Sequence, residues 1–288
     1  MDKKLLQDSI EKFKLGLFSS IRSASYGGKT YTDGQKAKEA LIRSQSLINY
    51  IHEAVKASFF AKLKEETAFN WTVHPPINKT KPELDIYGKI KKKKQDVVFL
   101  RAPERPFTFL DGPNVGQIDK VGAEATKKSI IIGLRSQMSS VDKNFDTLME
   151  RAFAETLNIR LRFPVITMGE VYLLPIEELD DEAMKKNKIT FKNKRVKIEK
   201  FIRTFNSFSG RSSLNLEEQY KYDASALILV DFKQDPPKII YNKMDLKQYG
   251  FSEEVCSMFE KISAHGFDER LLENYMSFQS EEGLLDKE

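Results

Sequence analysis

The sequence has few of the residues that build most metal and cofactor sites. Its 288 residues include one cysteine, Cys256, and three histidines, His52, His74 and His265. One cysteine excludes an intramolecular disulfide framework and a zinc site built from several cysteines. No apolar run approaches the roughly 20 residues of a membrane span, and the N-terminal MDKKLLQDSIEKF has no apolar signal core. These absences predict a soluble protein of the cytoplasm with no membrane partner.

Several catalytic signatures are also missing. The sequence contains no G-x-x-x-x-G-K-[ST] phosphate loop, no G-x-G-x-x-G opening a helix after a strand, and no G-x-S-x-G. Cys256 lies in an amphipathic stretch that favours a buried structural thiol. Carboxylates, lysines and arginines remain, and these side chains suit magnesium-dependent hydrolysis of phosphodiesters.

Positive charge is concentrated in two stretches. The net charge is only +5, but GKIKKKKQD and the segment from Lys185 to Arg203 are strongly basic. Such clusters can follow the phosphates of double-stranded DNA; the alternative is that they keep edge strands soluble. Arginine and asparagine can also read base edges. The candidate DNA-binding residues are Lys91, Lys92, Lys93, Lys94, Lys194, Arg195, Arg203, Asn206 and Arg211.

Hydrophobic periodicity predicts helices over about residues 1–70, the second running from about Gly34 to Thr67. LDIYGKI and DVVFLRA flank the lysine run like an antiparallel pair, and SIIIGLRS, FPVITMGEVYLLP and SALILVDF predict buried strands. We expect an α/β fold, with a central mixed β-sheet flanked by helices and a helical N-terminal extension. The expected regions are a helical one (1–74), an α/β core (75–250) and a helical tail packed on it (251–288).

The densest group of charged residues in apolar surroundings follows the SIIIGLRS strand. At 100° per residue, Glu155 falls at the border of the apolar face of the next helix, whereas Glu150 lies on the wet side. A carboxylate at that border needs a partner, and Arg135 is the expected one. The alternative is a purely structural pair. Glu170, inside an apolar strand, is a secondary candidate metal ligand.

The order of these features resembles a known family. A strand ends in Arg135-Ser136-Gln137 and is followed by a polar turn with Lys143-Asn144, by a Glu-Arg-Ala helix and by a Phe-Pro before the next strand. This order is similar to the core of type II restriction endonucleases of the PD-(D/E)xK superfamily, in its EcoRI-like branch. The resemblance implies a restriction-endonuclease-like fold. It also implies a sequence-specific, Mg²⁺-dependent double-stranded DNA endonuclease of a restriction–modification system, paired with a cognate DNA methyltransferase.

The family's metal and water ligands are only partly matched. Its members use an Asp on one strand, and a Glu two residues before a Lys on the next. Here Gly133 stands at the Glu position and Arg135 at the Lys position, and an arginine can serve only as a fixed positive charge. The resemblance implies that Glu150 or Glu155 replaces the Glu. It also implies that Gln137 acts as a polar ligand or as a water-orienting group, and that Lys143 supplies the amine.

Three residues compete for the family's Asp: Asp119, Asp96 and Asp111, of which Asp111, in FLDGP, is expected to start a turn. Asp119 is slightly favoured over Asp96, because hairpin spacing would bring it beside Arg135. The expected catalytic residues are Asp119, Arg135, Gln137, Lys143 and Glu155, and the expected Mg²⁺ ligands are Asp96, Asp119, Glu150 and Glu155.

Symmetric recognition sites imply a homodimer; a heterodimer cutting an asymmetric site is the alternative. The missing acidic-x-Lys leaves a second interpretation open, a non-cleaving DNA-binding protein or degenerate nuclease subunit. A third interpretation is an α/β scaffold that does not bind nucleic acid.

Overall fold

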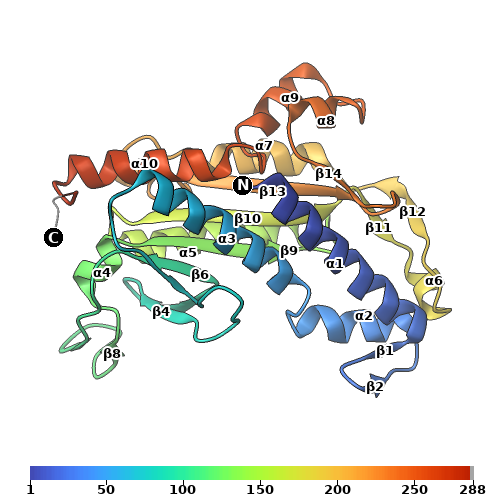
Figure 1. Cartoon of the computed structure of the whole chain (residues 1–288), viewed down its shortest axis with the longest axis horizontal. Coiled ribbons are helices and arrows are strands. Elements are labelled where there is room, and N and C mark those ends of the chain that lie inside the picture. Colours follow the sequence, from blue (N-terminus) through green and yellow to red (C-terminus); the bar gives the residue numbers. More distant parts are fainter. Residues whose placement is uncertain (286–288) are drawn as a thin grey trace.

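The protein has an α/β fold built on one six-stranded mixed sheet (Figure 1). The computed structural model describes residues 1–285. The strand order is β14-β13-β10-β9-β6-β3; β9, β10 and β13 are parallel, and the other three pair antiparallel with their neighbours. The strands are β3 (Thr72–His74), β6 (Val97–Leu100), β9 (Ile130–Ser136), β10 (Thr167–Pro175), β13 (Ala224–Asp231) and β14 (Lys238–Ile240).

Three helices cover one face of the sheet. They are α1 (Lys3–Ser23), α3 (Ile48–Glu66) and α10 (Phe267–Glu281), and Figure 1 shows α1 and α3 side by side across the strands. Ile130, Ile132 and Leu134 of β9 join their apolar residues in one cluster. The N-terminal helices therefore form a layer of the core, and α2 (Gly34–Arg43) packs against α1.

The opposite face is covered by α5 (Phe145–Arg160), α7 (Ile198–Phe208) and α9 (Glu253–Glu260). The apolar side chains on this face form two clusters, and the buried Cys256 belongs to one of them. Alternation along the strands turns Ile131 of β9 and Met168 and Tyr172 of β10 toward this side. The same alternation places Gly133, Arg135 and Glu170 on this side of the sheet. A polar site therefore interrupts the apolar face.

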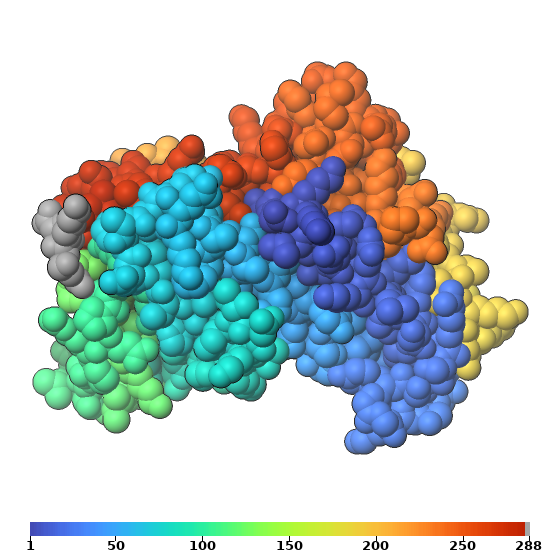
Figure 2. Space-filling model, in the orientation of Figure 1, coloured from blue at the N-terminus to red at the C-terminus, as the bar shows by residue number. Residues whose placement is uncertain are grey.

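Short elements surround this core. The two-stranded hairpins are β1 (Ser25–Tyr26) with β2 (Lys29–Thr30), β4 (Leu84–Tyr87) with β5 (Lys92–Gln95), β7 (Phe107–Thr108) with β8 (Ile118–Asp119), and β11 (Glu177–Leu179) with β12 (Phe191–Arg195). In Figure 2 the β1–β2 region (blue) and the β7–β8 region (green) project at opposite ends of the lower edge. The short helices are α4 (Ala123–Lys127), α6 (Asp181–Lys185) and α8 (Lys243–Lys247), with a 3₁₀ turn at Leu216–Glu218. Within residues 1–285 no helix combines the length and apolar character needed to cross a membrane.

The expected central sheet flanked by helices is confirmed, but two local expectations are wrong. The helix expected from Gly34 to Thr67 breaks after Arg43, where Gln45 adopts a positive φ of 61°, and resumes at Ile48. The lysine run is itself a strand, β5, and it pairs with β4, while the following DVVFL strand joins the main sheet.

A buried charge network joins the ends of β10, β13 and α5. Asp223 accepts hydrogen bonds from Arg160 at 2.5 Å, from Arg211 at 2.8 Å and from the backbone N–H of Met168 at 2.6 Å. The side chains of all three charged residues are fully buried. Removing one partner from such a network leaves charges that neither water nor protein compensates.

We therefore expect Asp223→Asn to lower the free energy of unfolding by about 3–5 kcal/mol, measured by urea denaturation. Glu254→Ala breaks the exposed pair with Arg203 and should leave the urea midpoint unchanged, because exposed pairs contribute little. Equal midpoints for the two variants would contradict the assigned role of Asp223.

Candidate active site

A polar cluster lies on the α5 side of the sheet, where β6, β9 and β10 meet. Glu170 of β10 is in register with Gly133 of β9. A Cβ added at Gly133 would overlap Oε2 of Glu170. A carboxylate therefore occupies the space beside position 133, but it comes from the neighbouring strand.

Arg135 connects this carboxylate to α5. Its guanidinium pairs with Glu155 and lies 3.3 Å from Oε1 of Glu170 through Nε. The predicted pairing of Arg135 with Glu155 is confirmed. Burial is the largest single influence on the pKa of Arg135 and lowers it, but the charge of Glu170, together with Tyr222, Asp96 and Tyr172, raises the pKa overall. Arg135 is thus a fixed cation between two acids.

Lys93 supplies an amine to the same cluster. It is the half-buried lysine of β5 and pairs with the other oxygen of Glu155. Burial, and next the charge of Arg135, lower the pKa of Lys93 to about 8, against the opposing effects of Glu170 and Asp96. A lysine with this pKa is partly neutral near physiological pH, so it can accept a proton.

Asn158 of α5 holds the hairpin that carries Lys93. Its Oδ1 accepts the backbone N–H of Ile90 at 3.0 Å, and its Nδ2 donates to the carbonyl of Lys91 at 2.9 Å. Gly88 leaves no room for a side chain, because a Cβ there would overlap Asn158. One helix therefore binds both the turn of the hairpin and, through Glu155, its lysine.

Asp96 lies between β5 and β6 at the edge of the cluster. Its Oδ2 accepts the backbone N–H of Leu134 at 2.8 Å, which places the carboxylate beside β9. Among the aspartates that compete for the family position, Asp96 therefore contacts the strand bearing Arg135.

Glu170 is the most deeply buried acid of the cluster, with 1% of its surface exposed. Neither of its oxygens has a well-aligned hydrogen bond within residues 1–285. Burial raises the pKa of Glu170, while Arg135 and Lys93 oppose the shift. The hydroxyls of Tyr172 and Tyr222 also have raised pKa values, caused by burial and then by the Glu170 charge. A buried carboxylate whose oxygens are incompletely hydrogen-bonded can hold a cation.

The expectation that Asp119 lies beside Arg135 is wrong. Its strand, β8, pairs only with β7, outside the central sheet. Asp119 is buried there, accepts the backbone N–H groups of Val121 and Gly122, and pairs with Arg162 at 3.4 Å. These contacts fit a structural role in its own turn.

The other expected site residues make no hydrogen bond or ion pair with the cluster within residues 1–285. Gln137 donates to the carbonyl of Ser139, Lys143 is exposed beside a separate basic pocket, and Glu150 is exposed on α5. Within residues 1–285 no three His, Cys, Asp or Glu side chains converge to hold a metal ion. The four expected Mg²⁺ ligands therefore do not form one group; Asp96 and Glu155 are the two at the cluster.

The candidate DNA-binding residues divide into exposed and engaged groups. Those exposed to solvent are Lys91, Lys92, Lys94, Lys194, Arg195 and Arg203, although Arg203 pairs with Glu199 and Glu254; Asn206 is half-buried. Lys93 belongs to the polar cluster. Arg211 is buried and donates to Asp223, Pro164 and Gln219. Its expected contact with bases is not compatible with this position.

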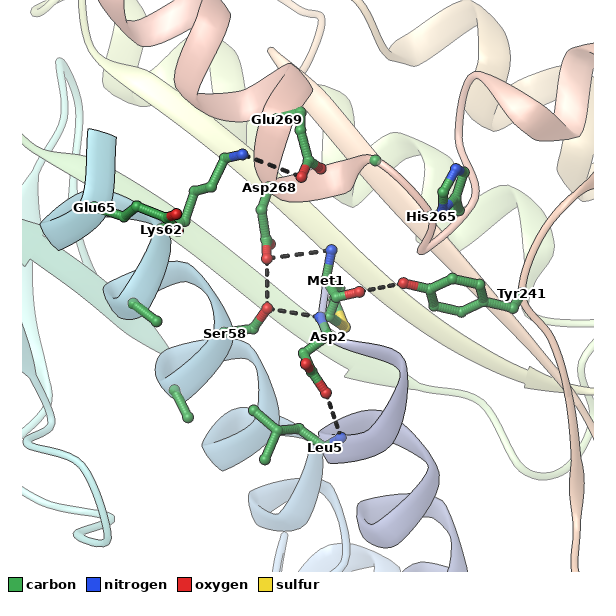
Figure 3. Close-up of a pocket in the computed structure, with 13 residues that line it drawn as sticks. Met1, Asp2, Leu5, Ser58, Lys62, Glu65, Tyr241, His265, Asp268 and Glu269 are labelled. Atoms are coloured by element: carbon green, nitrogen blue, oxygen red, sulfur yellow. Dashed lines mark hydrogen bonds and ion pairs between the residues drawn. The ribbon is translucent and has the colours of Figure 1, made fainter. Parts of the chain in front are cut away.

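A hollow of about 600 Å³ lies on the other side of the sheet, at the start of α1 (Figure 3). The amino group of Met1 pairs with Asp268 at 3.2 Å, and Lys62 pairs with Glu269 at 3.2 Å. Ser58 bridges Asp268 and the backbone N–H of Asp2. Two ion pairs therefore span this hollow, Met1 with Asp268 and Lys62 with Glu269.

Three comparisons with known proteins give no match. No protein-family model matches the chain, and no curated protein and no solved structure has significant similarity to it. The geometry of the polar cluster is thus the basis for a functional proposal.

The Gly133–Glu170 contact makes a prediction about stability. Gly133→Ala should lower the free energy of unfolding by about 1–3 kcal/mol, because the new methyl group overlaps the Glu170 carboxylate. In the Glu170→Ala background the same substitution should cost less, since the obstructing group is gone. Urea denaturation of the four proteins measures the coupling; an identical cost in both backgrounds would show that the two positions do not compete for space.

Proposed function

We propose that the protein is a sequence-specific, Mg²⁺-dependent double-stranded DNA endonuclease of a restriction–modification system, with a restriction-endonuclease-like core. The observation that supports this most is the polar cluster: Asp96 and Glu170 beside Lys93 and Arg135, where three sheet strands meet. The family resemblance implies two acids and an amine at one site. Here the cluster provides an acid beside β9, an acid beside position 133 and an amine, but from sequence positions that differ from those of the family.

The acids of the cluster fit Mg²⁺ chemically. Both oxygens of Glu170 lack well-aligned hydrogen bonds, and Asp96 uses Oδ2 for the backbone of Leu134. Carboxylate oxygens are the ligands that this hard cation prefers. Glu170 and Asp96 are the residues that would hold Mg²⁺, which would supply positive charge against the phosphate.

The remaining residues take distinct roles. Lys93, with its lowered pKa, accepts a proton from the attacking water. Arg135 keeps its charge and stabilises the negative charge that develops on the phosphate. Glu155 pairs with both cations, so it positions them and is not assigned as a metal ligand. For a palindromic DNA site we propose a homodimer, alongside a cognate methyltransferase.

A second candidate function has one observation in its favour. Both oxygens of Glu155 are engaged by cations, and no three acids converge within residues 1–285. This arrangement suits a protein that binds DNA without cutting it, such as a degenerate nuclease subunit. Salt-sensitive binding of DNA without Mg²⁺-dependent cleavage would select this candidate.

Incubation with unmethylated plasmid and phage DNA plus Mg²⁺ tests the primary proposal. The wild type should give discrete fragments. Glu170→Gln should lose cleavage, and Lys93→Met should lower the rate by roughly 10²–10⁴-fold, because it removes the base. Lys94→Met is the matched control: this neighbour on β5 is exposed and is a candidate DNA contact. Its loss should affect DNA binding only, and should leave the single-turnover rate at saturating protein unchanged. A fully active Glu170→Gln variant would refute the proposed site.

The pH dependence of cleavage tests the role of Lys93. A base works only when deprotonated, so the rate should fall about tenfold per pH unit below its pKa and level off above it. With the pKa of Lys93 lowered to about 8, we expect the midpoint near that pH in single-turnover rates measured between pH 6 and 9. Lys94→Met should keep the same midpoint. A rate that is flat across this range would exclude Lys93 as the base.

A further inference from the structure

A second charged feature borders the loop that joins β9 to α5. A cavity of about 340 Å³ lies between residues 140–143 and residues 192–197. Figure 1 shows β11, β12 and α6, which form its outer wall, at one end of the molecule. Five of its lining residues are basic: Lys143, Lys192, Lys194, Arg195 and Lys197. We call this cavity the basic pocket.

The three acids of the basic pocket are already satisfied by protein groups. Glu178 accepts the backbone N–H of Val141 at 2.7 Å and pairs with Lys192 at 3.0 Å. Asp181 pairs with the same lysine at 3.0 Å, and Asp142 accepts the backbone N–H of Lys197 at 3.1 Å. One lysine and two backbone amides therefore engage the negative charge of the pocket.

The remaining cations lack such partners. Lys143, Lys194 and Lys197 are exposed and make no ion pair with any other described residue. Arg195 donates one N–H to the carbonyl of Tyr249 at 2.9 Å, which leaves other donors of its guanidinium available. Cations gathered around one concavity repel each other and attract an anion. The pocket thus has the charge and the donors for a phosphate group.

Its lining favours a backbone phosphate over a free nucleotide. Val141 and Val196 are the apolar lining residues, and no aromatic side chain lines the pocket to stack on a base. Recognition there would depend on charge and hydrogen bonds, as it does for DNA phosphates. The pocket also borders the loop at Ser140, which holds a positive φ of 51°, between the strand of Arg135 and the helix of Glu155.

We propose that the basic pocket binds a phosphate of double-stranded DNA outside the polar cluster, through Lys143, Lys194, Lys197 and Arg195. This inference rests on the proposed function, because it takes DNA as the substrate. A phosphate held there would fix the register of the duplex, and it would contact the loop that connects the two sides of the polar cluster.

The test is DNA affinity as a function of salt, measured by fluorescence anisotropy of a labelled duplex without Mg²⁺. The pocket variant is Lys143→Ala/Lys194→Ala/Lys197→Ala. The control variant, Lys4→Ala/Lys12→Ala/Lys261→Ala, removes the same charge from exposed lysines elsewhere. Each lost phosphate contact lowers the slope of log K against log salt by about 0.9. We expect the pocket variant to lose about 1–3 in slope and at least tenfold in affinity, and the control variant to keep the wild-type slope.

A second measurement identifies the source of the phosphate. Isothermal titration calorimetry with inorganic phosphate at constant ionic strength should show only weak binding to the wild type. Tight, pocket-dependent binding of phosphate together with an unchanged DNA slope would overturn the assignment to DNA.

Failure of the pocket assignment can be distinguished from failure of the proposed function. If the wild type binds and cuts DNA while the pocket and control variants share one slope, only the pocket assignment fails. If the wild type does not bind DNA, the proposed function fails with it. Urea denaturation should give the same midpoint for both variants, so that lost binding is not caused by unfolding.

Discussion

The polar site depends on one carboxylate, that of Glu170, which is buried within the central sheet and shielded from solvent. Glu170 is 1% exposed, and an ionised acid at such a position is costly unless cations lie next to it. Arg135 meets that need from the adjacent strand, and Lys93 from a hairpin. Glycine at position 133 leaves the space that the carboxylate fills. The arrangement of the other charged groups follows from this constraint, since each cation then acquires Glu155 as a second partner.

The two charge networks of the protein differ in a way that suggests different uses. Asp223 is fully occupied by two arginines and a backbone amide, so it closes the junction of β10, β13 and α5. Glu170 has nearby cations but no well-aligned donors. A saturated network stabilises a fold, whereas an unsaturated one retains ligand capacity. For this reason the functional proposal rests on Glu170, although both acids are buried.

The central sheet and its helices were predictable from the sequence, because long apolar runs such as SIIIGLRS and SALILVDF bury both faces of a strand. The pairing of Arg135 with Glu155 was predictable for a similar reason, since helical spacing placed the acid at the apolar border. The role of Lys93 was not predictable from the sequence. In a run of four lysines only strand alternation and the docking of the hairpin decide which one turns inward. Glu170 was recognised as a buried acid, but its register against Gly133 depends on how two strands align across a helical crossover. Asp119 was misplaced because its turn forms a hairpin of its own.

Asn158 has a consequence for how the polar cluster is assembled. It ties the turn of the β4–β5 hairpin to α5, and Glu155 on the same helix holds the hairpin's lysine. The hairpin pairs with no strand of the central sheet, but β5 continues into β6 through Asp96 alone. Lys93 is therefore held from two sides, by Glu155 of α5 and by the chain that leads into the sheet. A substitution at Asn158 or Glu155 would release the amine from α5 while Glu170, Arg135 and Asp96 stay in place on the sheet.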